Sequence, residues 1–599
     1  MMKRSLKLFV LLLTIFLLSN AQQKPNVIIM VTDDQGYGDI GAHGNTIINT
    51  PAMDKLHSES IRLTNFHVDP SCAPTRAALM SGKYSHHARV WHTVRGGNHM
   101  RASEISMADV FQHNGYQTGM FGKWHLGANY PYRPMDRGFE EWLGCGDGGT
   151  GTSDCYFWND RVNDMYWHNG EREYREGFNP DVFYTSAEEY IKKRKKNKPF
   201  FIYLPTYIPH KPYTSPYKNL GEQYVKYIGK GIEKDCPPFY ALIEHIDGNI
   251  AKLRQVLEDE GIADNTIIIF MTDNGSTHGR HAFNAGMSGG KGSTSDGGHR
   301  VPFFIHWPKG GITGGKDINT LSAHIDVLPT LAELCGMKFP KAKENDLDGR
   351  SLVPLFKDNV ASWPDRTIVV EKQREVERNP SNSAIMTQKW RLVGHNKLFD
   401  IDNDPGQKNN VFKDHPEVVK KLMADFDKHW QKVTVDDRSF PTPIVGTKHD
   451  KEIFLSISEL RDGNGFAHGY SASGREAKGV WHIEAYKSGI YEFEVCRWPK
   501  EVDATFTGIP EITKKVDAWS NKSPKTALMT SGKLTAIPYG AVSLKVGDEF
   551  YEMRDVKADT KTMTFNVKLN KGKTIVDAVF YNKEGKQITN AYYVYVRRK

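Results

Sequence analysis

Residues 71–82 (SCAPTRAALMSG) place a cysteine directly before a turn and a short helical run. Pro74 near the expected helix start and Gly82 after the last turn are common start and stop signals. Cys72 is therefore expected at a helix N-terminus, where unpaired N–H groups and the helix dipole favour an anion. Arg76, one turn further on, can bring its guanidinium back to the same point. These residues predict a reactive sulfur beside an anion-binding site, with a buried structural cysteine as the alternative.

Acidic side chains follow two of the most apolar runs. Residues 25–31 and 266–271 are short and β-branched, the pattern of strands buried on both faces. The side chains after them are Asp33 and Asp34 in the first case and Asp273 and Asn274 in the second. Neighbouring carboxylates at the end of a buried strand are costly unless a cation compensates them, although a polar turn with one capping aspartate would explain either pair alone. Together the three carboxylates and the amide form an all-oxygen set that suits Ca²⁺ better than Zn²⁺.

Basic side chains follow further strand patterns. The run at residues 116–121 leads into Lys123 and His125, and a later run leads into His210. A lone histidine after a strand is more often structural, but both histidines follow the kind of strand that presents the acidic groups. Lys291 lies in a glycine-rich loop, which lets the backbone and a cation approach a bound anion closely. We therefore expect these four side chains in the same site.

The elements that must position these residues alternate between strand and helix patterns over some three hundred residues. This alternation predicts an α/β domain over residues 24–365, with a mostly parallel sheet between helices on both faces. Open sheets of this kind bind ligands outside the carboxyl ends of their strands. The candidate residues are expected at this edge.

Shorter β patterns begin near residue 366. We expect a small antiparallel sheet subdomain over residues 366–438, with strands at 367–370, 390–393 and 398–401. A proline-containing segment at 439–451 is predicted as a linker.

The rest of the chain, residues 452–599, has only β patterns. It predicts a separate all-β sandwich domain of a usual size. Two hairpins are expected within it, because short glycine-containing turns join their strand patterns. The first would join residues 480–486 to 490–495, and the second would join 562–569 to 574–581.

Residues 1–21 have the pattern of a secretory signal peptide, with Lys3, Arg4 and Lys7 before an apolar run and a small-residue cleavage site. The run is short for a membrane span, and no later stretch is apolar enough to be one. We expect an exported protein, periplasmic or secreted, without a membrane span. The net charge of +8 over 599 residues is too small to indicate a nucleic-acid partner.

Six scattered cysteines do not form a disulfide scaffold. Cys145 and Cys155 could bridge a glycine-rich loop, and this pairing stays open.

Taken in order, these motifs resemble those of the type I, formylglycine-dependent sulfatases of the alkaline phosphatase superfamily. Residues 72–76 (CAPTR) match the family's Cys-x-Pro-x-Arg signature. The resemblance covers roughly residues 24–437 and includes TDD at 32–34, GKWH at 122–125, PH at 209–210, TDNG at 272–275 and RVP at 300–302. It implies an alkaline phosphatase-like fold. One departure is Asp296, where the family commonly has glutamate.

The resemblance also implies the cofactors. Cys72 would be oxidised to formylglycine (3-oxoalanine) by a formylglycine-generating or anaerobic sulfatase-maturating enzyme. One Ca²⁺ would be held by the modified Cys72 together with Asp33, Asp34, Asp273 and Asn274.

In the mechanism that the resemblance implies, a hydroxyl of the hydrated aldehyde attacks the sulfur of a sulfate monoester. Arg76 and Lys123 would stabilise the hydrate, and Lys123 and Lys291 would neutralise the sulfate oxygens. His210, with Lys291, would protonate or stabilise the leaving oxygen. His125 would take the proton of the second hydroxyl, so that sulfate is released.

The expected activity is that of a sulfuric ester hydrolase acting on a sulfated polysaccharide or its oligosaccharides. Resemblance to enzymes of polysaccharide-degrading Bacteroidetes favours algal glycans such as ulvan, carrageenan or fucoidan, and glycosaminoglycans stay open. Residues 91–101, residues 147–158, Arg280 and His281 are expected to shape the sugar pocket. The C-terminal sandwich would either bind glycan or pack against the enzyme. The alternatives are a phosphonate or phosphodiester hydrolase of the same superfamily and a non-catalytic glycan-binding protein.

Overall fold

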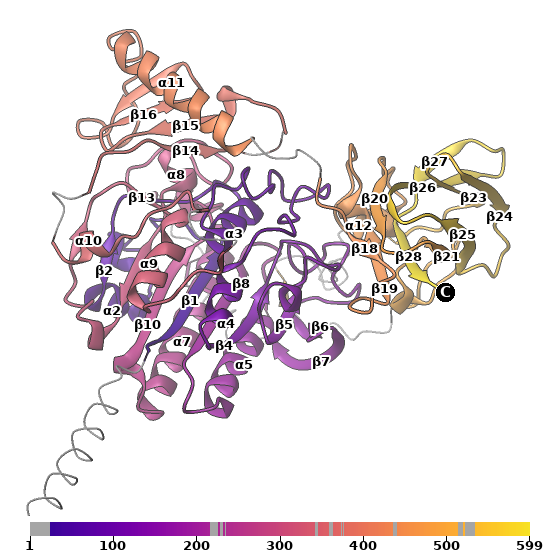
Figure 1. Cartoon of the computed structure of the whole chain (residues 1–599), viewed down its shortest axis with the longest axis horizontal. Helices are drawn as coiled ribbons and strands as arrows, with labels where there is room; N and C mark the ends of the chain where they lie inside the picture. Colours follow the sequence, from indigo (N-terminus) through magenta and orange to yellow (C-terminus); the bar gives the residue numbers. More distant parts are fainter. Residues whose placement is uncertain are drawn as a thin grey trace, which may run out of the picture.

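The computed structural model describes residues 24–215, 226–227, 232–233, 235–341, 346–358, 363–372, 374, 376–434, 440–512, 519–520 and 534–599. The signal peptide predicted at residues 1–21 lies outside them, as does the start of the predicted linker at residue 439. None of the described helices combines the length and the apolar character that a membrane crossing requires. The described chain forms a large α/β body, a small sheet beside it and a β-sandwich (Figure 1).

A ten-stranded sheet is the centre of the α/β body. Its middle strands, in spatial order, are β10 (Thr266–Thr272), β1 (Asn26–Asp33), β8 (Phe200–Pro209), β4 (Gln117–Lys123) and β5 (Glu141–Cys145), and all are parallel. Beyond them lie β11 (Phe303–His306), β2 (Ile61–Leu63) and β12 (Asp317–Ile318) at one edge, and β6 (Val162–His168) and β7 (Glu171–Phe178) at the other. The edges contain antiparallel pairs. The predicted mostly parallel sheet is confirmed at its centre.

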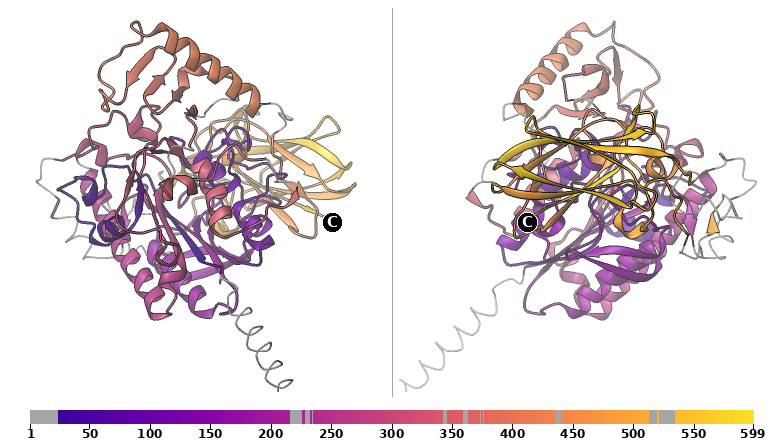
Figure 2. Two further views of the ribbon diagram at one scale, coloured as in Figure 1. Left: turned by 60° about the vertical axis from the view of Figure 1, so that its left-hand side comes forward. Right: turned by 90° about the vertical axis from the view of Figure 1, so that its right-hand side faces the viewer.

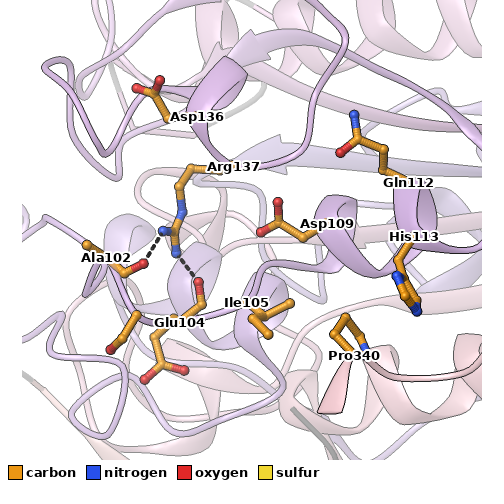
Figure 3. A pocket seen from close by; sticks show the side chains of 10 residues that line it. Ala102, Glu104, Ile105, Asp109, Gln112, His113, Asp136, Arg137 and Pro340 are labelled. Atoms are coloured by element: carbon orange, nitrogen blue, oxygen red, sulfur yellow. Dashed lines mark hydrogen bonds between the residues drawn. The ribbon is translucent and has the colours of Figure 1, made fainter. Parts of the chain in front are cut away.

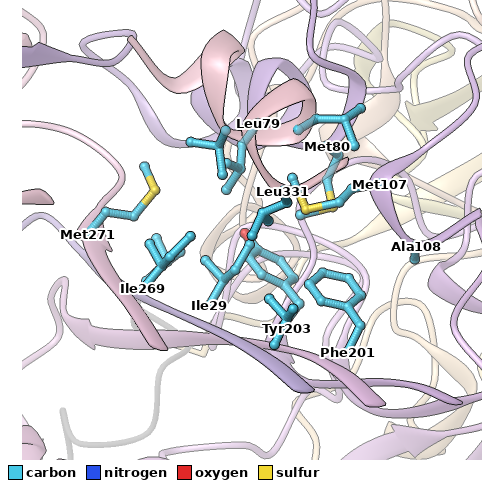
Figure 4. Close-up of a cluster of buried hydrophobic side chains, with 14 of the residues drawn as sticks. Ile29, Leu79, Met80, Met107, Ala108, Phe201, Tyr203, Ile269, Met271 and Leu331 are labelled. Atoms are coloured by element: carbon cyan, nitrogen blue, oxygen red, sulfur yellow. The ribbon is translucent and has the colours of Figure 1, made fainter. Parts of the chain in front are cut away.

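Alternate residues of β1 pack on opposite faces of the sheet. Ile29 lies in one apolar cluster (Figure 4), with side chains of α3 (Cys72–Ser81), α4 (Met107–His113) and α9 (Val327–Leu334). Ile28 and Met30 lie in a second cluster, with side chains of α2 (Pro51–Glu59), α5 (Asn179–Lys193) and α7 (Cys236–Asp259). Both faces of the sheet are therefore buried at β1, and this explains the unbroken apolar run of the strand.

The small sheet is an antiparallel meander, as predicted. Its strands are β14 (Ile368–Glu371), β15 (Ser383–Met386), β16 (Trp390–Val393) and β17 (Lys397–Asp400). The amphipathic helix α11 (Pro416–Val433) packs on it through Leu422 and Phe426. Neither β15 nor α11 was among the predicted elements. Asp296, the departure from the family pattern, joins this sheet to the body through an ion pair with Arg391 at 3.2 Å.

The remaining elements are short. They are β3 (Phe66–His67) paired with β13 (Ser322–Ala323), β9 (Thr214–Ser215) paired with β22 (Trp519–Ser520), α8 (Asp296–His299), α10 (Val353–Phe356) and α12 (Gly469–Ser473).

Asp348 connects α11 to the α/β body. Its carboxylate accepts hydrogen bonds from Tyr84 N at 2.9 Å and His87 Nδ1 at 2.9 Å, and it pairs with Lys432 Nζ at 2.5 Å. Burial opposes ionisation, but His87 and Lys432 hold the pKa of this carboxyl well below its usual range. A lowered carboxyl pKa stabilises the folded state above the unfolded pKa of 3.8, and this stability is lost as the pH falls through the folded pKa.

Asp348→Asn is therefore expected to lower the free energy of unfolding at pH 7 by about 2 kcal/mol, between the values for exposed and buried pairs. Denaturant unfolding at pH 7 and pH 3 measures this difference, which should shrink at pH 3. Asp427→Asn, which alters an exposed pair with Arg378, is the control. An equal loss at both pH values would contradict the electrostatic explanation.

The C-terminal region is a two-sheet β-sandwich, as predicted. One sheet contains β18 (Ile444–Val445), β20 (Trp481–Ala485), β26 (Gly572–Asn582), β23 (Tyr539–Val546), β24 (Phe550–Asp555) and β27 (Gln587–Asn590). The other contains β19 (Glu452–Ser456), β28 (Tyr593–Arg598), β21 (Gly489–Cys496) and β25 (Thr562–Leu569). Strand β18 falls within the segment predicted as a linker.

Both predicted hairpins are wrong. β20 pairs with β26 and β21 pairs with β25, so each short turn joins strands of different sheets. The turn after Ala485 and the turn after Leu569 therefore cross the sandwich. The alternation of apolar and polar residues determines which side chains of a strand are buried in the core, but it does not specify the strand's hydrogen-bonding partner.

The sandwich lies at one side of the α/β body in Figure 1, faces the viewer in the right-hand view of Figure 2, and contacts two loops of that body. Arg95 N donates to Ser458 O at 2.5 Å, and Ser153 Oγ donates to Ser456 Oγ at 3.0 Å. The ring of Phe157 packs edge-on against Trp498 in a shared apolar cluster. The contacted loop 92–99 lies within the predicted pocket segment 91–101, and the contacted loop 147–158 is the second predicted pocket segment.

Candidate active site

Four neighbouring strands deliver the candidate residues to one edge of the sheet. Asp33 ends β1, Lys123 ends β4, Asp273 directly follows β10 and His210 directly follows β8. Cys72 is the first residue of α3, and Gly82 ends this helix in a left-handed conformation with φ 66°. The predicted strand ends and the predicted helix start are confirmed.

The acidic residues and the cysteine form one buried cluster. Single ligand atoms of Asp33, Cys72 and Asp273 all lie within 4.8 Å of one another. Asp34 N donates to Asp273 Oδ1 at 3.2 Å, and Asn274 Nδ2 donates to Asp34 Oδ1 at 3.0 Å. The structure thus brings together all five residues predicted to hold a metal.

Three cationic side chains pair with these carboxylates. Lys123 Nζ lies 2.6 Å from Asp33 Oδ2, and Lys291 Nζ pairs with Asp34 Oδ1. Arg76 Nη2 lies 2.7 Å from Asp273 Oδ2, and its Nη1 donates to the carbonyl oxygen of Lys123 at 3.1 Å. Each of the three cations is thus paired with a carboxylate, and each also interacts electrostatically with Cys72.

The carboxylates of Asp33 and Asp273 affect one another. Burial opposes ionisation of Asp33, but Lys123 and the other nearby cations hold its pKa well below the usual range. Burial and the charge of Asp33 raise the pKa of Asp273 to about 8. Two buried carboxylates at this separation therefore lack enough positive charge to be ionised together near pH 7.

The donor set fits a divalent cation. Asp33 Oδ1 and Asn274 Oδ1 are buried and have no hydrogen-bond partner among the described residues. A cation held by them would satisfy both oxygens and remove the repulsion between Asp33 and Asp273. Oxygen ligands of this kind suit Ca²⁺.

His125 is buried close to Lys123 and Asp147. Its Nε2 is 2.8 Å from the carbonyl oxygen of Thr93 and 3.5 Å from Asp147 Oδ1, and its backbone is left-handed with φ 66°. Burial and the nearby Lys123 lower the pKa of the imidazole to about 3. The ring is therefore neutral near pH 7, the form that can accept a proton.

His210 lies on the more open side. Its side chain is 31% exposed, whereas those of Lys123 and His125 are 1% and 4% exposed. Its Nδ1 lies 2.6 Å from the carbonyl oxygen of Lys211, and its Nε2 lies 3.8 Å from Asp34 Oδ2. Burial among the site residues lowers its pKa. An open position suits a group that meets the departing part of a substrate.

Sequence reasoning missed three residues beside the site. Tyr203 OH contacts Arg76 Nη1 at 3.5 Å, and the buried Arg161 donates to the same Lys211 carbonyl that His210 contacts. Asp147 was predicted only as part of a pocket loop. Each residue lies inside a strand or loop that has no local motif, so only the fold shows its position.

The expected pocket residues on the other loops have varied positions. Trp91 is 9% exposed. Its neighbour His92 accepts a hydrogen bond at Nδ1 from Thr93 N at 2.9 Å. Arg280 Nε contacts His281 at 3.1 Å. The Arg280 side chain also lies against Gly290, next to Lys291.

A separate pocket surrounds Arg137 (Figure 3). Its guanidinium donates to the carbonyl oxygens of Ala102 at 2.9 Å and Glu104 at 2.5 Å. None of the lining residues belongs to the candidate site. The two carbonyl bonds indicate a structural role for this arginine.

All six cysteines, each of them a described residue, carry free thiols. The bridge between Cys145 and Cys155 is therefore not formed, although the two buried thiols are hydrogen-bonded. Burial and Cys145 raise the pKa of Cys155 well above its usual value.

Comparison with known proteins gives consistent matches. The family model described as "Sulfatase" matches residues 25–337, and the one described as "N-sulphoglucosamine sulphohydrolase, C-terminal" matches residues 292–435. Human arylsulfatase A is 30% identical over 455 residues, which cover 66% of this chain and 86% of that protein. Human N-acetylgalactosamine-6-sulfatase is 29% identical over 371 residues, covering 56% and 67%.

A solved structure is similar as well. The crystal structure of Ps i-CgsB in complex with k-i-k-neocarrahexaose is 30% identical to this chain, with a TM-score of 0.61. The match covers 69% of this chain and 93% of that one.

Proposed function

Because this chain belongs to the sulfatase family, and so is a sulfuric ester hydrolase, we propose that it cleaves sulfate monoesters of a carbohydrate with formylglycine at residue 72 and one Ca²⁺. The observation that carries this proposal is the buried cluster of Cys72, Asp33 and Asp273, surrounded by three cationic side chains. Family membership sets aside the alternative of a non-catalytic glycan-binding protein.

Asp33, Asp34, Asp273, Asn274 and the modified Cys72 would hold the Ca²⁺. The cation and the hydrated formylglycine would together supply a hydroxyl nucleophile of lowered pKa.

The remaining roles follow from position and charge. Arg76 and Lys123 hold the group at residue 72 in place, and Lys123 and Lys291 neutralise the sulfate oxygens. His210, on the open side with Lys291, would protonate or stabilise the leaving oxygen. His125, neutral and buried, would be the residue that accepts a proton from the group at residue 72.

For the substrate we propose a sulfated polysaccharide or its oligosaccharides, with algal glycans such as ulvan or carrageenan as the first candidates. The similar Ps i-CgsB structure holds k-i-k-neocarrahexaose, and this oligosaccharide supports the class. The name of the human relative, N-acetylgalactosamine-6-sulfatase, keeps glycosaminoglycans among the candidates.

We also propose export, to the periplasm or the outside, and modification of Cys72 by a maturase of the formylglycine-generating or anaerobic type. The domain bounds proposed are 24–365, 366–438 and 452–599. Sequencing the N-terminus of the mature protein would test the cleavage after residue 21. The intact mass of the peptide that contains Cys72 would test the modification.

The activity test compares an aryl sulfate with an aryl phosphodiester on the matured enzyme. A higher kcat/KM on the sulfate is expected, and a higher value on the diester would support the phosphodiester hydrolase instead. A screen of defined sulfated oligosaccharides would then identify the sugar. Strict chelation of Ca²⁺ should abolish the activity reversibly.

A further inference from the structure

Asp147 is a buried carboxylate that the proposed mechanism leaves unused. It is 3% exposed, and a side-chain hydrogen bond links it to Asp154. Its Oδ1 lies 3.5 Å from His125 Nε2. A buried carboxylate is costly unless positive or hydrogen-bearing groups face it, so the groups around Asp147 decide its role.

The geometry around His125 fixes which ring nitrogen carries the proton. The Thr93 carbonyl oxygen, 2.8 Å from Nε2, can only accept a hydrogen bond, so Nε2 must donate. Nδ1 is buried and has no hydrogen-bond partner among the residues that the structure describes. A Cβ at Gly148 would lie 3.0 Å from Nε2, so the loop backbone holds the ring on this side. The lone pair of Nδ1 is therefore the one available to accept a proton.

A second carboxyl allows Asp147 to be buried. Asp154, 5% exposed, lies beside Asp147 at the other end of the same loop. Burial and Asp147 raise the pKa of Asp154 well above its usual value, with smaller contributions from Cys145 and Glu459. Asp154 therefore holds a proton, and the pair carries one negative charge.

The other charged groups near His125 disfavour its protonation. Lys123 and Arg76 both lower its pKa, and Asp147 raises it. His92, on the preceding loop, also interacts with the ring. Asp147 is thus the carboxylate that stabilises a protonated His125.

The C-terminal sandwich contacts both loops that carry the groups facing Nε2. Arg95 N, two residues after Thr93, bonds to Ser458 O, and Ser153, next to Asp154, bonds to Ser456. The two loops that carry the histidine's partners are therefore attached to one short segment, residues 456–458.

We propose that Asp147 is a positioning residue for His125: it faces Nε2–H, leaves Nδ1 as the base, and stabilises the imidazolium formed when Nδ1 takes a proton. This inference rests on the proposed function. The proton comes from a hydroxyl on the modified Cys72 and moves to Nδ1, Nε2 keeps its own hydrogen, and the resulting positive charge faces the Asp147 carboxylate. Asp154 keeps the proton that lets the two carboxyls lie together.

The kinetic test uses Asp147→Asn in the matured full-length enzyme. We expect kcat on an aryl sulfate to fall 10- to 100-fold, a part of the roughly 10²- to 10⁴-fold that a general base contributes, and KM to change less than 3-fold. Asp154→Asn is the matched control, because it keeps a neutral hydrogen-bonding group beside Asp147, and it should retain kcat within 3-fold. Asp147→Glu should recover part of the loss. Equal kcat values for Asp147→Asn and the wild type would overturn the proposal.

A second readout does not depend on turnover. Nitrogen-15 chemical shifts of histidine-labelled protein report which ring nitrogen carries hydrogen, and the signals of His125 are assigned by their loss in His125→Gln. The wild type should show the Nε2–H form, and the acid-induced shift of these signals should begin at lower pH in Asp147→Asn than in the wild type. An unchanged onset in a folded variant would overturn the proposal even if the enzyme is active. A changed onset in a protein without sulfatase activity would support the pairing and reject the proposed function.

Discussion

Cys72→Ala is expected to abolish turnover while leaving the fold largely intact and Ca²⁺ bound through the four other ligands. In other hydrolases, removal of the nucleophile lowers kcat by more than about 10⁴-fold. In this chain, alanine at residue 72 cannot be converted to formylglycine. The small, 4% exposed side chain has an alanine neighbour in α3, so helix formation should not suffer. Aryl sulfate turnover, circular dichroism and Ca²⁺ titration measure the three quantities.

Cys335→Ala is the matched control, because this thiol is also 4% exposed and also lies in the α/β core. It should keep its activity within about twofold and lose only the stability of a small cavity. Appreciable turnover in Cys72→Ala would show that the proposed nucleophile is wrong.

Asp273→Asn is expected to weaken Ca²⁺ binding strongly and to lower kcat by about 10³-fold, a loss typical of removing one preorganised charge from an active site. The raised pKa, about 8, means that Asp273 is largely protonated at pH 7 without a cation. A neutral isostere should therefore disturb the metal-free fold little. The loss should appear when the cation binds.

The same pKa predicts a pH dependence. Ca²⁺ must displace the proton of Asp273, so its affinity should rise with pH up to about 8 and then level off. In Asp273→Asn this rise should disappear. Isothermal titration in buffers of different ionisation enthalpy would count the released proton.

Asp39→Asn serves as the control for burial. Asp39 is also 0% exposed, and burial raises its pKa to about 7, but its Oδ2 accepts from Gly36 N at 2.8 Å outside the cluster. Ca²⁺ affinity should be unchanged in this variant. Full activity of Asp273→Asn under strict chelation would count against a metal role.

Much of the site could be predicted because it lies at the ends of strands. The apolar run of β1 and that of β10 predict parallel strands, and parallel strands bring Asp33 and Asp273 to one edge. The helix signals around Cys72 are local, so they are also readable from the sequence. The prediction that Lys291 lies in the site comes from its glycine-rich loop motif and not from the periodicity of a strand or helix.

The partners of β-strands and the second layer of the site could not be predicted. β20 and β21 have a turn between them that suits a hairpin, yet each pairs with a strand far along the chain. The contact between His125 and Asp147 depends on how a loop returns to the sheet edge. Such contacts are set by packing among distant segments, and neither spacing nor residue type encodes them.

The pairing within the sandwich has a consequence for the order in which the molecule assembles. β19 hydrogen-bonds along its length to β28, the last strand of the chain, and β21 pairs with β28 on its other side. Contacts this distant in sequence close slowly, because the loop entropy is lost before they form. The loops that carry Thr93 and Asp147 contact residues 456–458, at the end of β19. The surroundings of His125 therefore depend on a pairing between strands that lie far apart in the sequence.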